Sequence, residues 1–277
     1  MISKNLLKTI RQLEQKKARQ RERLFVAEGP KVVNELMATF NPRHIVATNQ
    51  YYQIHSVHCQ HPDAQLHIVT DDELRRISFL QHPQQVLAVF ELPDQHPTPI
   101  TQHQSPNTQH PPFGRAGVGS NSCPLMLALD GIQDPGNLGT IIRIADWFGI
   151  KTILCSTDTA DAYNPKVVQA TMGSLARVHL YYSNLPDILD ALPDSIPVYG
   201  TFLDGNDIFR EKLSPSGIIV MGNEGNGISA PVAQRINRRL LIPHYSIPGT
   251  SLTSGGPDSL NVAIATAITC AEFRRRF

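Results

Sequence analysis

Residues 127–150 read LALDGIQDPGNLGTIIRIADWFGI, and this stretch decides the fold class of the chain. An apolar run stops at Asp130, a turn rich in glycine and proline follows, and apolar residues then recur with helical spacing. A buried strand followed by a tight turn and a helix is typical of one β–α unit of a parallel sheet. The sequence therefore predicts an α/β fold in which this strand lies inside the sheet.

The same alternation continues toward the C-terminus. Near-continuous apolar runs separated by helical patterns predict a mostly parallel sheet with helices on both faces. The expected strands are 125–130, 152–156, 176–182, 197–204, 217–222 and 239–243, and the expected helices are about 137–149, 164–174, 184–192, 229–237 and 259–275. Because ligands of such sheets bind beyond the carboxyl ends of the strands, three segments are candidate sites: 130–137, 222–228 and 243–259.

Asn137 and Arg143 are the notable polar side chains that follow the first strand, and two interpretations are open for them. Asn137 stands where a helix N-cap is expected, and Arg143 can pair with Asp146 about one turn later. Taken alone, the residues favour this structural role. Alternatively, an amide and a guanidinium at the mouth of a sheet suit a ligand rich in oxygen.

The other two segments also leave alternatives open. Residues 218–229, IIVMGNEGNGIS, hold Glu224 among glycines whose spacing matches neither the dinucleotide fingerprint nor the P-loop. A solvated turn explains them as well as a ligand site does. In residues 242–268, Asp258 or Ser259 is expected to cap the last helix. Asn261 then lies in an apolar helical start, where its side chain either competes for backbone groups or serves a ligand.

The first third of the chain predicts a second, smaller α/β domain. Its expected strands are 24–27, 44–48, 66–70 and 86–92, and helical patterns cover 2–23 and begin again at Asp71. Residues 93–124 hold seven of the 21 prolines and almost no large apolar residues, which is typical of a linker. We therefore expect domains at 1–92 and 125–277, joined by a linker at 93–124.

Positive charge is concentrated at the N-terminus, although the formal net charge is only +1. Residues 1–31 contain nine Lys and Arg against three Glu. Such a cluster is typical either of a solvated helix face or of a surface that binds a phosphate backbone. Residues 274–276 form a second basic cluster. The candidates for phosphate contact are Lys16, Lys17, Arg19 and Arg21.

Composition argues against several classes of protein. No apolar run reaches 18 residues, so no membrane span is expected, and the basic N-terminus lacks the apolar core of a secretory signal. The four cysteines show no C-x-x-C spacing, so no disulfide framework is expected. The cluster of His55, His58, Cys59 and His61 matches no standard zinc pattern, so no metal is expected. A reducing, cytoplasmic location is the expectation.

Taken together and in order, three motifs resemble those of the SpoU/TrmH family of SPOUT RNA methyltransferases. They are NLGTIIR at 137–143, MGNEGNG at 221–227, and IP at 242–243 with SLNVA at 259–263. In addition, KARQRERLFVAEGP at 17–30 resembles the substrate-binding domain that is often attached to this family. The resemblance covers most of the C-terminal half and is specific because each motif follows a predicted strand.

The resemblance implies a C-terminal SPOUT domain with a deep trefoil knot and a small N-terminal α/β RNA-binding domain. It implies a homodimer, packed partly through the last helix, with no DNA or membrane partner. It also implies that S-adenosyl-L-methionine is bound in the knot and that a methyl group is transferred to a ribose 2′-hydroxyl in tRNA or rRNA. By motif position, the cofactor is held by Thr201, Gly222, Ile242 and Leu260. The implied catalytic and RNA-facing residues are Asn137, Arg143, Glu224, Ser259 and Asn261.

Two roles for Arg143 stay open: it is either the general base or a clamp for charge on phosphate and ribose, held by a bidentate pair with Glu224. The chain departs from the family pattern at residues 244–258, where fifteen residues separate Pro243 from Ser259 and are expected to alter the rim of the cofactor pocket. The alternatives to ribose methylation are an RNA-binding scaffold without catalysis and a SPOUT methyltransferase that acts on a base.

Overall fold

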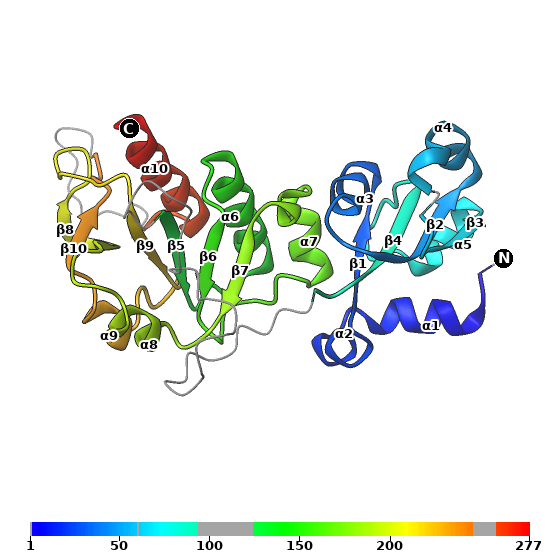
Figure 1. Ribbon diagram of the computed structural model, residues 1–277, viewed down its shortest axis with the longest axis horizontal. Coiled ribbons are helices and arrows are strands. Elements are labelled where there is room, and N and C mark those ends of the chain that lie inside the picture. The colour runs from blue at the N-terminus through cyan, green and yellow to red at the C-terminus, as the bar shows by residue number, and fades with distance from the viewer. Residues whose placement is uncertain (1, 60, 94–123, 246–258) are drawn as a thin grey trace. The chain divides into compact units, whose positions relative to one another are not determined.

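A computed structural model describes residues 2–59, 61–93, 124–245 and 259–277 (Figure 1). The chain groups into two compact units, each described here by itself. The N-terminal unit contains residues 1–95 together with 138–143 and 160–177, and the C-terminal unit contains the remainder. The expected linker at 93–124 falls almost wholly outside the described residues, and the expected domain boundaries stay a prediction.

A four-stranded mixed sheet organises the N-terminal unit. Its strand order is β1-β4-β2-β3, in which β4 is antiparallel to both neighbours and β2 is parallel to β3. All four expected strands are confirmed to within about two residues. The strands are β1 (Leu24–Glu28), β2 (Pro42–Thr48), β3 (Gln65–Val69) and β4 (Val86–Glu91). The helices of this unit are α1 (Lys4–Gln12), α2 (Lys16–Glu22), α3 (Pro30–Met37), α4 (Asn49–Cys59), α5 (Asp71–Ile77) and α7 (Pro165–Thr171), with a 3₁₀ turn at Ser174–Ala176.

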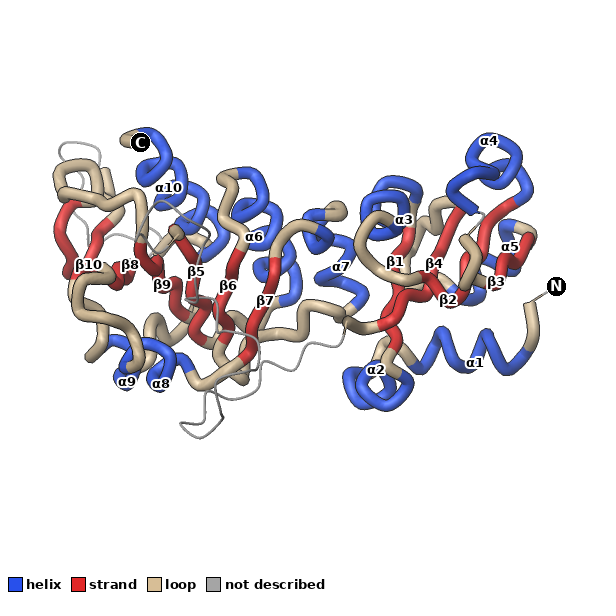
Figure 2. The backbone as a smooth tube through the Cα atoms, in the orientation of Figure 1, coloured by secondary structure: helices blue, strands red, loops and turns tan. Residues whose placement is uncertain are grey.

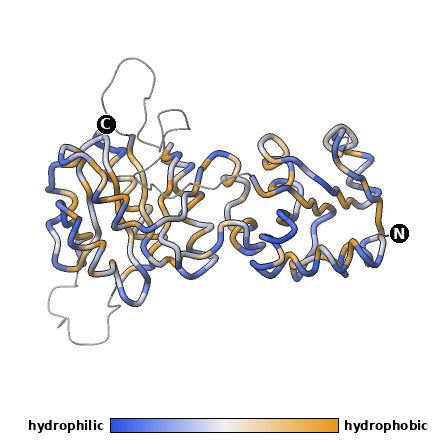
Figure 3. Tube along the Cα trace, turned by 60° about the horizontal axis from the view of Figure 1, so that its bottom comes forward, coloured by the Kyte–Doolittle hydropathy of each residue, from blue (hydrophilic) through white to orange (hydrophobic). Residues whose placement is uncertain are grey.

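The single helix expected over 2–23 is wrong, because α1 and α2 are separate helices. Hydrophobic and hydrophilic residues alternate along this segment (Figure 3). Ile10 and Leu13 are fully buried in the core of the unit. The first helix ends at its C-cap, Leu13. The Arg19 guanidinium, on α2, donates to the Leu13 and Glu14 carbonyl oxygens, both at 2.7 Å. A charged donor therefore satisfies carbonyls that a helix end leaves without partners.

A six-stranded parallel sheet organises the C-terminal unit and confirms the predicted fold class (Figure 2). Its order is β10-β8-β9-β5-β6-β7, so the strand from the opening sequence, β5, lies in the interior. The strands are β5 (Leu125–Asp130), β6 (Thr152–Cys155), β7 (His179–Tyr182), β8 (Val198–Asp207), β9 (Gly217–Gly222) and β10 (Arg238–Leu241). The helices are α8 (Leu185–Asp190), α9 (Ala230–Ala233) and α10 (Val262–Arg275), and α6 (Pro135–Trp147) has its two ends in this unit.

Helices cover both faces of this sheet, as the apolar strands predict. Met126 and Ala128 of β5 pack with Ile218 and Val220 of β9, with α8 and with Val232 of α9. The α10 helix lies on the other face and contacts β9 (Figure 2). No helix in the described ranges is long and apolar enough to cross a membrane.

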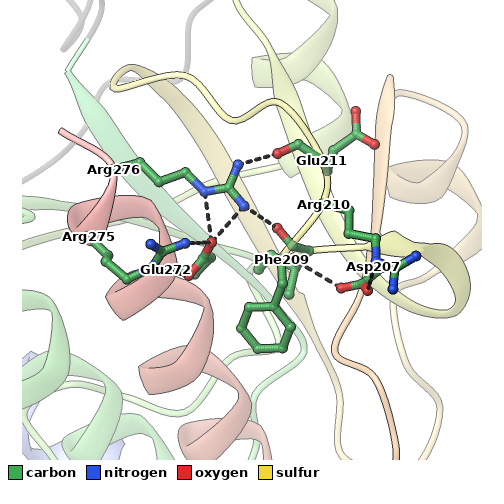
Figure 4. A network of polar contacts seen from close by, with 8 residues as sticks. Asp207, Phe209, Arg210, Glu211, Glu272, Arg275 and Arg276 are labelled. Atoms are coloured by element: carbon green, nitrogen blue, oxygen red, sulfur yellow. Dashed lines mark hydrogen bonds and ion pairs between the residues drawn. The ribbon is translucent and has the colours of Figure 1, made fainter.

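The arginines of the second basic cluster, 274–276, make structural hydrogen bonds and ion pairs. Arg274 donates to the Phe148 carbonyl at 2.7 Å. Arg276 donates to the carbonyl oxygens of Ile208, at 2.9 Å, and Glu211. Arg275 and Arg276 also bind the carboxylate of Glu272, whose side chain is only 4% exposed (Figure 4).

This network predicts a pH-dependent part of the stability. Hydrogen bonds from Arg275, and then from Arg276, lower the pKa of Glu272 from its usual range to about 2. Because the folded-state pKa is depressed, the carboxylate stabilises the fold above the ordinary pKa of about 4.5 and loses that contribution as the pH falls toward 2. We expect about 1–2 kcal/mol, after allowing for screening by solvent at the helix end.

Urea unfolding of the parent and of Glu272→Gln from pH 2 to 6 measures this contribution. The difference in unfolding free energy should be largest above pH 5 and should approach zero near pH 2. A difference that stays constant across this range would show that the charge of Glu272 does not stabilise the fold.

Candidate active site

Three polar side chains from segments far apart in the sequence meet at the carboxyl edge of the parallel sheet. The Asn137 side-chain NH₂ donates to Glu224 Oε1 at 2.7 Å, and the Asn261 NH₂ donates to Asn137 Oδ1 at 2.9 Å. Asn137 lies in the first turn of α6, Glu224 follows β9, and Asn261 precedes α10. The structure thus joins one residue from each of the three motifs by hydrogen bonds.

Asn137 does not cap α6, so this interpretation of the residue is wrong. The N-cap is Asp134, whose carboxylate accepts from the Asn137 backbone N–H at 2.8 Å, and Pro135 occupies the first turn. A proline loses nothing there because the first N–H groups of a helix have no partner within it, and an acid at this end is favoured by the helix dipole. The Asn137 side chain is therefore available to Glu224 and Asn261.

Asn261, and not Asp258 or Ser259, caps α10. Its Oδ1 accepts from the backbone N–H groups of Ala263 and Ile264 at 3.0 and 3.3 Å. Ser259 is exposed and precedes the helix, which begins at Val262, and Asp258 lies outside the described residues. The helix begins about three residues later than expected because the side chain of Asn261, rather than that of Ser259, reaches the first free N–H groups.

The cap also orients the whole set of amides. Since Asn261 Oδ1 accepts from the helix, its NH₂ is the group that faces Asn137. Asn137 must then present Oδ1 to Asn261 and its NH₂ to Glu224, because an amide has one acceptor end and one donor end. Glu224 consequently receives a donor from a side chain that is itself held in place. We call Asn137, Glu224 and Asn261 the polar triad.

Asn223 builds the turn that presents Glu224, and the sequence analysis did not single it out. Its Oδ1 accepts from the Gly225 and Asn226 N–H groups at 2.9 and 3.0 Å, and its NH₂ donates to the Gly131 carbonyl at 2.7 Å. An asparagine that bonds the backbone two residues later is a common turn former, which is the signal that was available in the sequence. Asn223 thus links the turn after β9 to the turn after β5.

Gly222 has no room for a side chain. A Cβ atom there would lie 2.3 Å from the Gly227 carbonyl carbon, since backbone hydrogen bonds between Asn223 and Gly227 close the turn tightly. Gly227 itself has φ +69°, in the left-handed region that glycine adopts readily. The two glycines therefore determine the shape of the loop that carries Glu224.

Arg143 lies on α6, six residues after Asn137, and its side chain is exposed. Glu224 accepts from the Asn137 side chain. The expected pairs of Arg143 with Glu224 and with Asp146 stay predictions.

Three of the residues expected to hold a cofactor lie on or directly after three neighbouring strands. Thr201 is on β8 and donates to Met221 Sδ at 3.9 Å, Gly222 ends β9, and Ile242 follows β10. Leu260 lies just before the cap of α10 and is 48% exposed. The pairing of β8 with β10 skips from Gly200 to Asn206, so residues 201–205 leave the regular ladder at this edge. The extended loop falls mainly on 246–258, outside the described residues.

Arg19 is not an RNA-facing residue, so this prediction is wrong. It is 1% exposed, and its Nη2 lies 2.6 Å from the Asp161 carboxylate. The guanidinium also donates to two carbonyl oxygens within the N-terminal unit. Lys16 and Lys17 are exposed on α2, and Arg21 is exposed beside Glu22. These three residues remain candidates for phosphate contact.

A cavity of about 640 Å³ in the N-terminal unit is not an evident anion site. Three carboxylates and two arginines line it, and Arg43 is already paired with Glu91. An anion would therefore meet no net positive charge there. The charged and titratable lining residues are Glu22, Arg23, Arg43, His44, Asp63 and Glu91.

Two family models match the chain. The SpoU rRNA Methylase family model matches residues 124–271, and the MRM3-like substrate binding domain matches residues 4–88. The first of these ranges contains all three motifs, and the second contains most of the basic N-terminus.

Similar proteins span nearly the whole chain. The 23S rRNA (guanosine(2553)-2′-O)-methyltransferase RlmP of Bacillus subtilis is 28% identical over 97% of this chain and 95% of its own length. A Porphyromonas gingivalis protein assigned to the TrmH family of RNA methyltransferases is 40% identical, with a TM-score of 0.81 and full coverage of both chains.

An rRNA methyltransferase of Sinorhizobium meliloti, solved with bound AdoMet, is 28% identical with a TM-score of 0.78 and covers 100% of this chain and 96% of its own. More than half of the chain matches the first family model, and the polar triad joins the three motifs that this match contains. The chain therefore belongs to the SpoU rRNA Methylase family.

Proposed function

We propose that the protein transfers a methyl group from S-adenosylmethionine to a ribose 2′-hydroxyl of ribosomal RNA. The observation that carries the proposal is the polar triad, which joins the three motifs at the edge of the sheet where ligands of such folds bind. A scaffold that only binds RNA would not need an oriented amide–carboxylate set at this edge. The named activity of the Bacillus subtilis relative supports the ribose 2′-oxygen, rather than a base, as the target.

The residues at the strand ends fit S-adenosylmethionine. Gly222 ends β9, Ile242 follows β10, and Thr201 lies one residue beyond the pairing of β8 with β9, so their backbone groups can hydrogen-bond a polar, amino-acid-like ligand. Leu260 is a large apolar side chain left 48% exposed at the same edge, which suits the flat face of an adenine ring. When bound, the cofactor supplies a methyl group on a positively charged sulfur.

The protein must align the ribose 2′-hydroxyl, a weak nucleophile, with the methyl group of the cofactor, and the hydroxyl must lose its proton. Positioning alone accounts for much of the acceleration of such a transfer. We assign Glu224, held by Asn137, the role of orienting the RNA ribose or Arg143. We assign Arg143 the role of stabilising negative charge on the ribose oxygen or the adjoining phosphate. A guanidinium stays protonated in proteins, which favours a clamp over a general base. Ser259, exposed before the cap, remains a candidate contact for RNA.

Incubation of the protein with methyl-labelled S-adenosylmethionine and separated rRNA or tRNA tests the proposal. We expect label in rRNA with the parent and a large loss with Asn137→Ala, whereas Gln234→Ala, which removes an exposed amide elsewhere, should behave as the parent. Binding of RNA without any transfer would favour the scaffold. Label confined to tRNA would overturn the substrate class.

We propose that the protein is a homodimer that packs through α10. Ile264 is 54% exposed, and Ile268 and Ala271 continue the same face without charge. A face of this kind is usually covered by a partner.

Light scattering should give about twice the chain mass of 30.7 kDa, and Ile264→Lys should shift the protein toward the monomer. Ile54→Lys, at a 68% exposed position on α4, is the matched control. A parent that is an active monomer would contradict the proposal.

We propose that Lys16 and Lys17 contact the RNA backbone. Each phosphate contact contributes roughly 0.7–0.9 to the slope of log K against log salt, so Lys16→Ala/Lys17→Ala should flatten the slope by up to about 1.8. Cofactor affinity should not change. A Lys151→Ala/Lys212→Ala variant removes the same charge from exposed positions elsewhere and should leave the slope unchanged. An unaltered slope in the Lys16 and Lys17 variant would mean that this face of α2 is only solvated.

The trefoil knot, the domain boundaries and a cytoplasmic location stay predictions. A knot can be traced only through residues 246–258, and these lie outside the described residues.

A further inference from the structure

The α10 helix is held at both of its ends. At its N-terminus Asn261 belongs to the polar triad and donates to Asn137 of α6 at 2.9 Å. At its C-terminus Arg274 donates from Nε to the Phe148 carbonyl at 2.7 Å and from Nη2 to the Gly149 carbonyl at 3.3 Å. Phe148 and Gly149 end α6, so the two helices are joined at their first and at their last turns.

The lengths of the two helices match these two joints. The α6 helix has 13 residues and α10 has 14, so each is about 20 Å long. Gly149 adopts φ +67° and ends α6, which leaves the last carbonyl groups of the helix without partners inside it. A cation at this end is favoured by the helix dipole, and Arg274 supplies it from the neighbouring helix.

Arg276 fixes the same helix to a third element of the site. It donates to the Ile208 carbonyl at 2.9 Å and to the Glu211 carbonyl, in the segment that directly follows β8 (Figure 4). Glu272, one turn earlier on α10, accepts from Arg276 Nε at 2.7 Å and holds the guanidinium in this direction. The strand β8 carries Thr201, so the C-terminus of α10 is tied to two elements that carry site residues.

We propose that Arg274 and Arg276, the C-terminal clamp, are positioning residues that set the place of Asn261 in the polar triad. A helix is stiff along its axis, so fixing its last turn fixes the height of its first residue. The hydrogen bond between Asn261 and Asn137 is lost if the amides slide apart by roughly 1 Å. The assignment of a catalytic role to this effect rests on the proposed function.

Kinetics of matched variants test the clamp. Misplacement of a site by about 1 Å can cost up to 100-fold in rate, so Arg274→Ala and Arg276→Ala should each lower kcat at least about 10-fold while KM for RNA changes less than about threefold. Arg275→Ala is the control, since Arg275 binds only Glu272 among the described residues and is 66% exposed. Arg274→Lys keeps the cation at the end of α6 and should recover part of the loss.

A double variant separates positioning from general weakening. If Arg274 acts through Asn261, then Arg274→Ala should cost little once Asn261→Ala is present, because the two changes disrupt the same contact. If the fold-reductions in kcat of the two single variants multiply in the double variant, the proposal is overturned. If Arg274→Ala does not fold, Arg274→Lys takes its place. Its reduction in kcat should likewise be small once Asn261→Ala is present.

Hydrogen exchange gives a readout that does not need methyl transfer. The N–H groups of Ala263 and Ile264 are capped by Asn261, so peptides that cover 259–266 should exchange faster in Arg274→Ala and not in Arg275→Ala, without cofactor or RNA. Unchanged exchange there would overturn the clamp even if the enzyme is active. Faster exchange in a protein that methylates no RNA would support the clamp and refute the proposed function instead.

Discussion

Replacement of Arg143 by alanine is expected to lower the rate of methyl transfer by about 100-fold or more, a loss typical for removal of one group that stabilises developing charge. The side chain is exposed on α6, so the free energy of unfolding should change by less than about 0.5 kcal/mol. Single-turnover transfer with saturating labelled cofactor measures the effect. Calorimetry with S-adenosylmethionine should show unchanged cofactor binding.

The lysine variant distinguishes a clamp from a base. As a clamp, Arg143→Lys keeps the charge but loses the planar fork, so it should retain a measurable fraction of the rate without gaining from alkaline pH. As a base, lysine loses its proton more easily than arginine, and the rate should rise toward its ordinary pKa of about 10.4. We expect the first result. Transfer at the parent rate by Arg143→Ala would remove Arg143 from the site altogether.

Replacement of Arg19 by alanine is expected to destabilise the protein by about 3 kcal/mol or more, the usual cost of removing one partner of a buried ion pair. Asp161 would keep a carboxylate that is only 18% exposed, and the Leu13 and Glu14 carbonyls would lose their donor. Urea unfolding followed by circular dichroism measures this loss. The effect should be the largest of any single charged residue on α2.

Arg21→Ala is the matched control for this change. Its side chain is 65% exposed and pairs only with the adjacent Glu22 among the described residues, so the loss should stay below about 1 kcal/mol. A stable Arg19→Ala variant with weakened RNA binding would reverse our correction and return Arg19 to the RNA-facing set.

Sequence reasoning predicted the strands well because a parallel sheet covered on both faces leaves near-continuous apolar runs. The strand at 217–222 and its neighbour at 125–130 were predicted to the residue, and these two strands pair in the interior of the sheet. Helix starts were predicted less well. Several polar residues near each start can cap a helix, and the sequence pattern did not distinguish Asp134 from Asn137 or Asn261 from Ser259.

Arginines that make structural hydrogen bonds to distant segments were the other failure. Arg19 stands in a basic run that looks solvated, but its partner Asp161 is 142 positions away. Arg274 and Arg276 likewise bind carbonyl oxygens from distant segments, which no local pattern reveals. A run of positive charge in a sequence therefore does not tell which of its members face solvent.

Analysis of the labelled nucleoside tests the central claim most directly. Ribosomal RNA methylated by the parent is digested to nucleosides, and the labelled product is identified by mass spectrometry. We predict that the methyl group lies on the ribose, so that the adjoining phosphodiester also resists alkali, and that Asn137→Ala abolishes this product. A methyl group on the base, or no labelled nucleoside from any RNA fraction, would contradict the account.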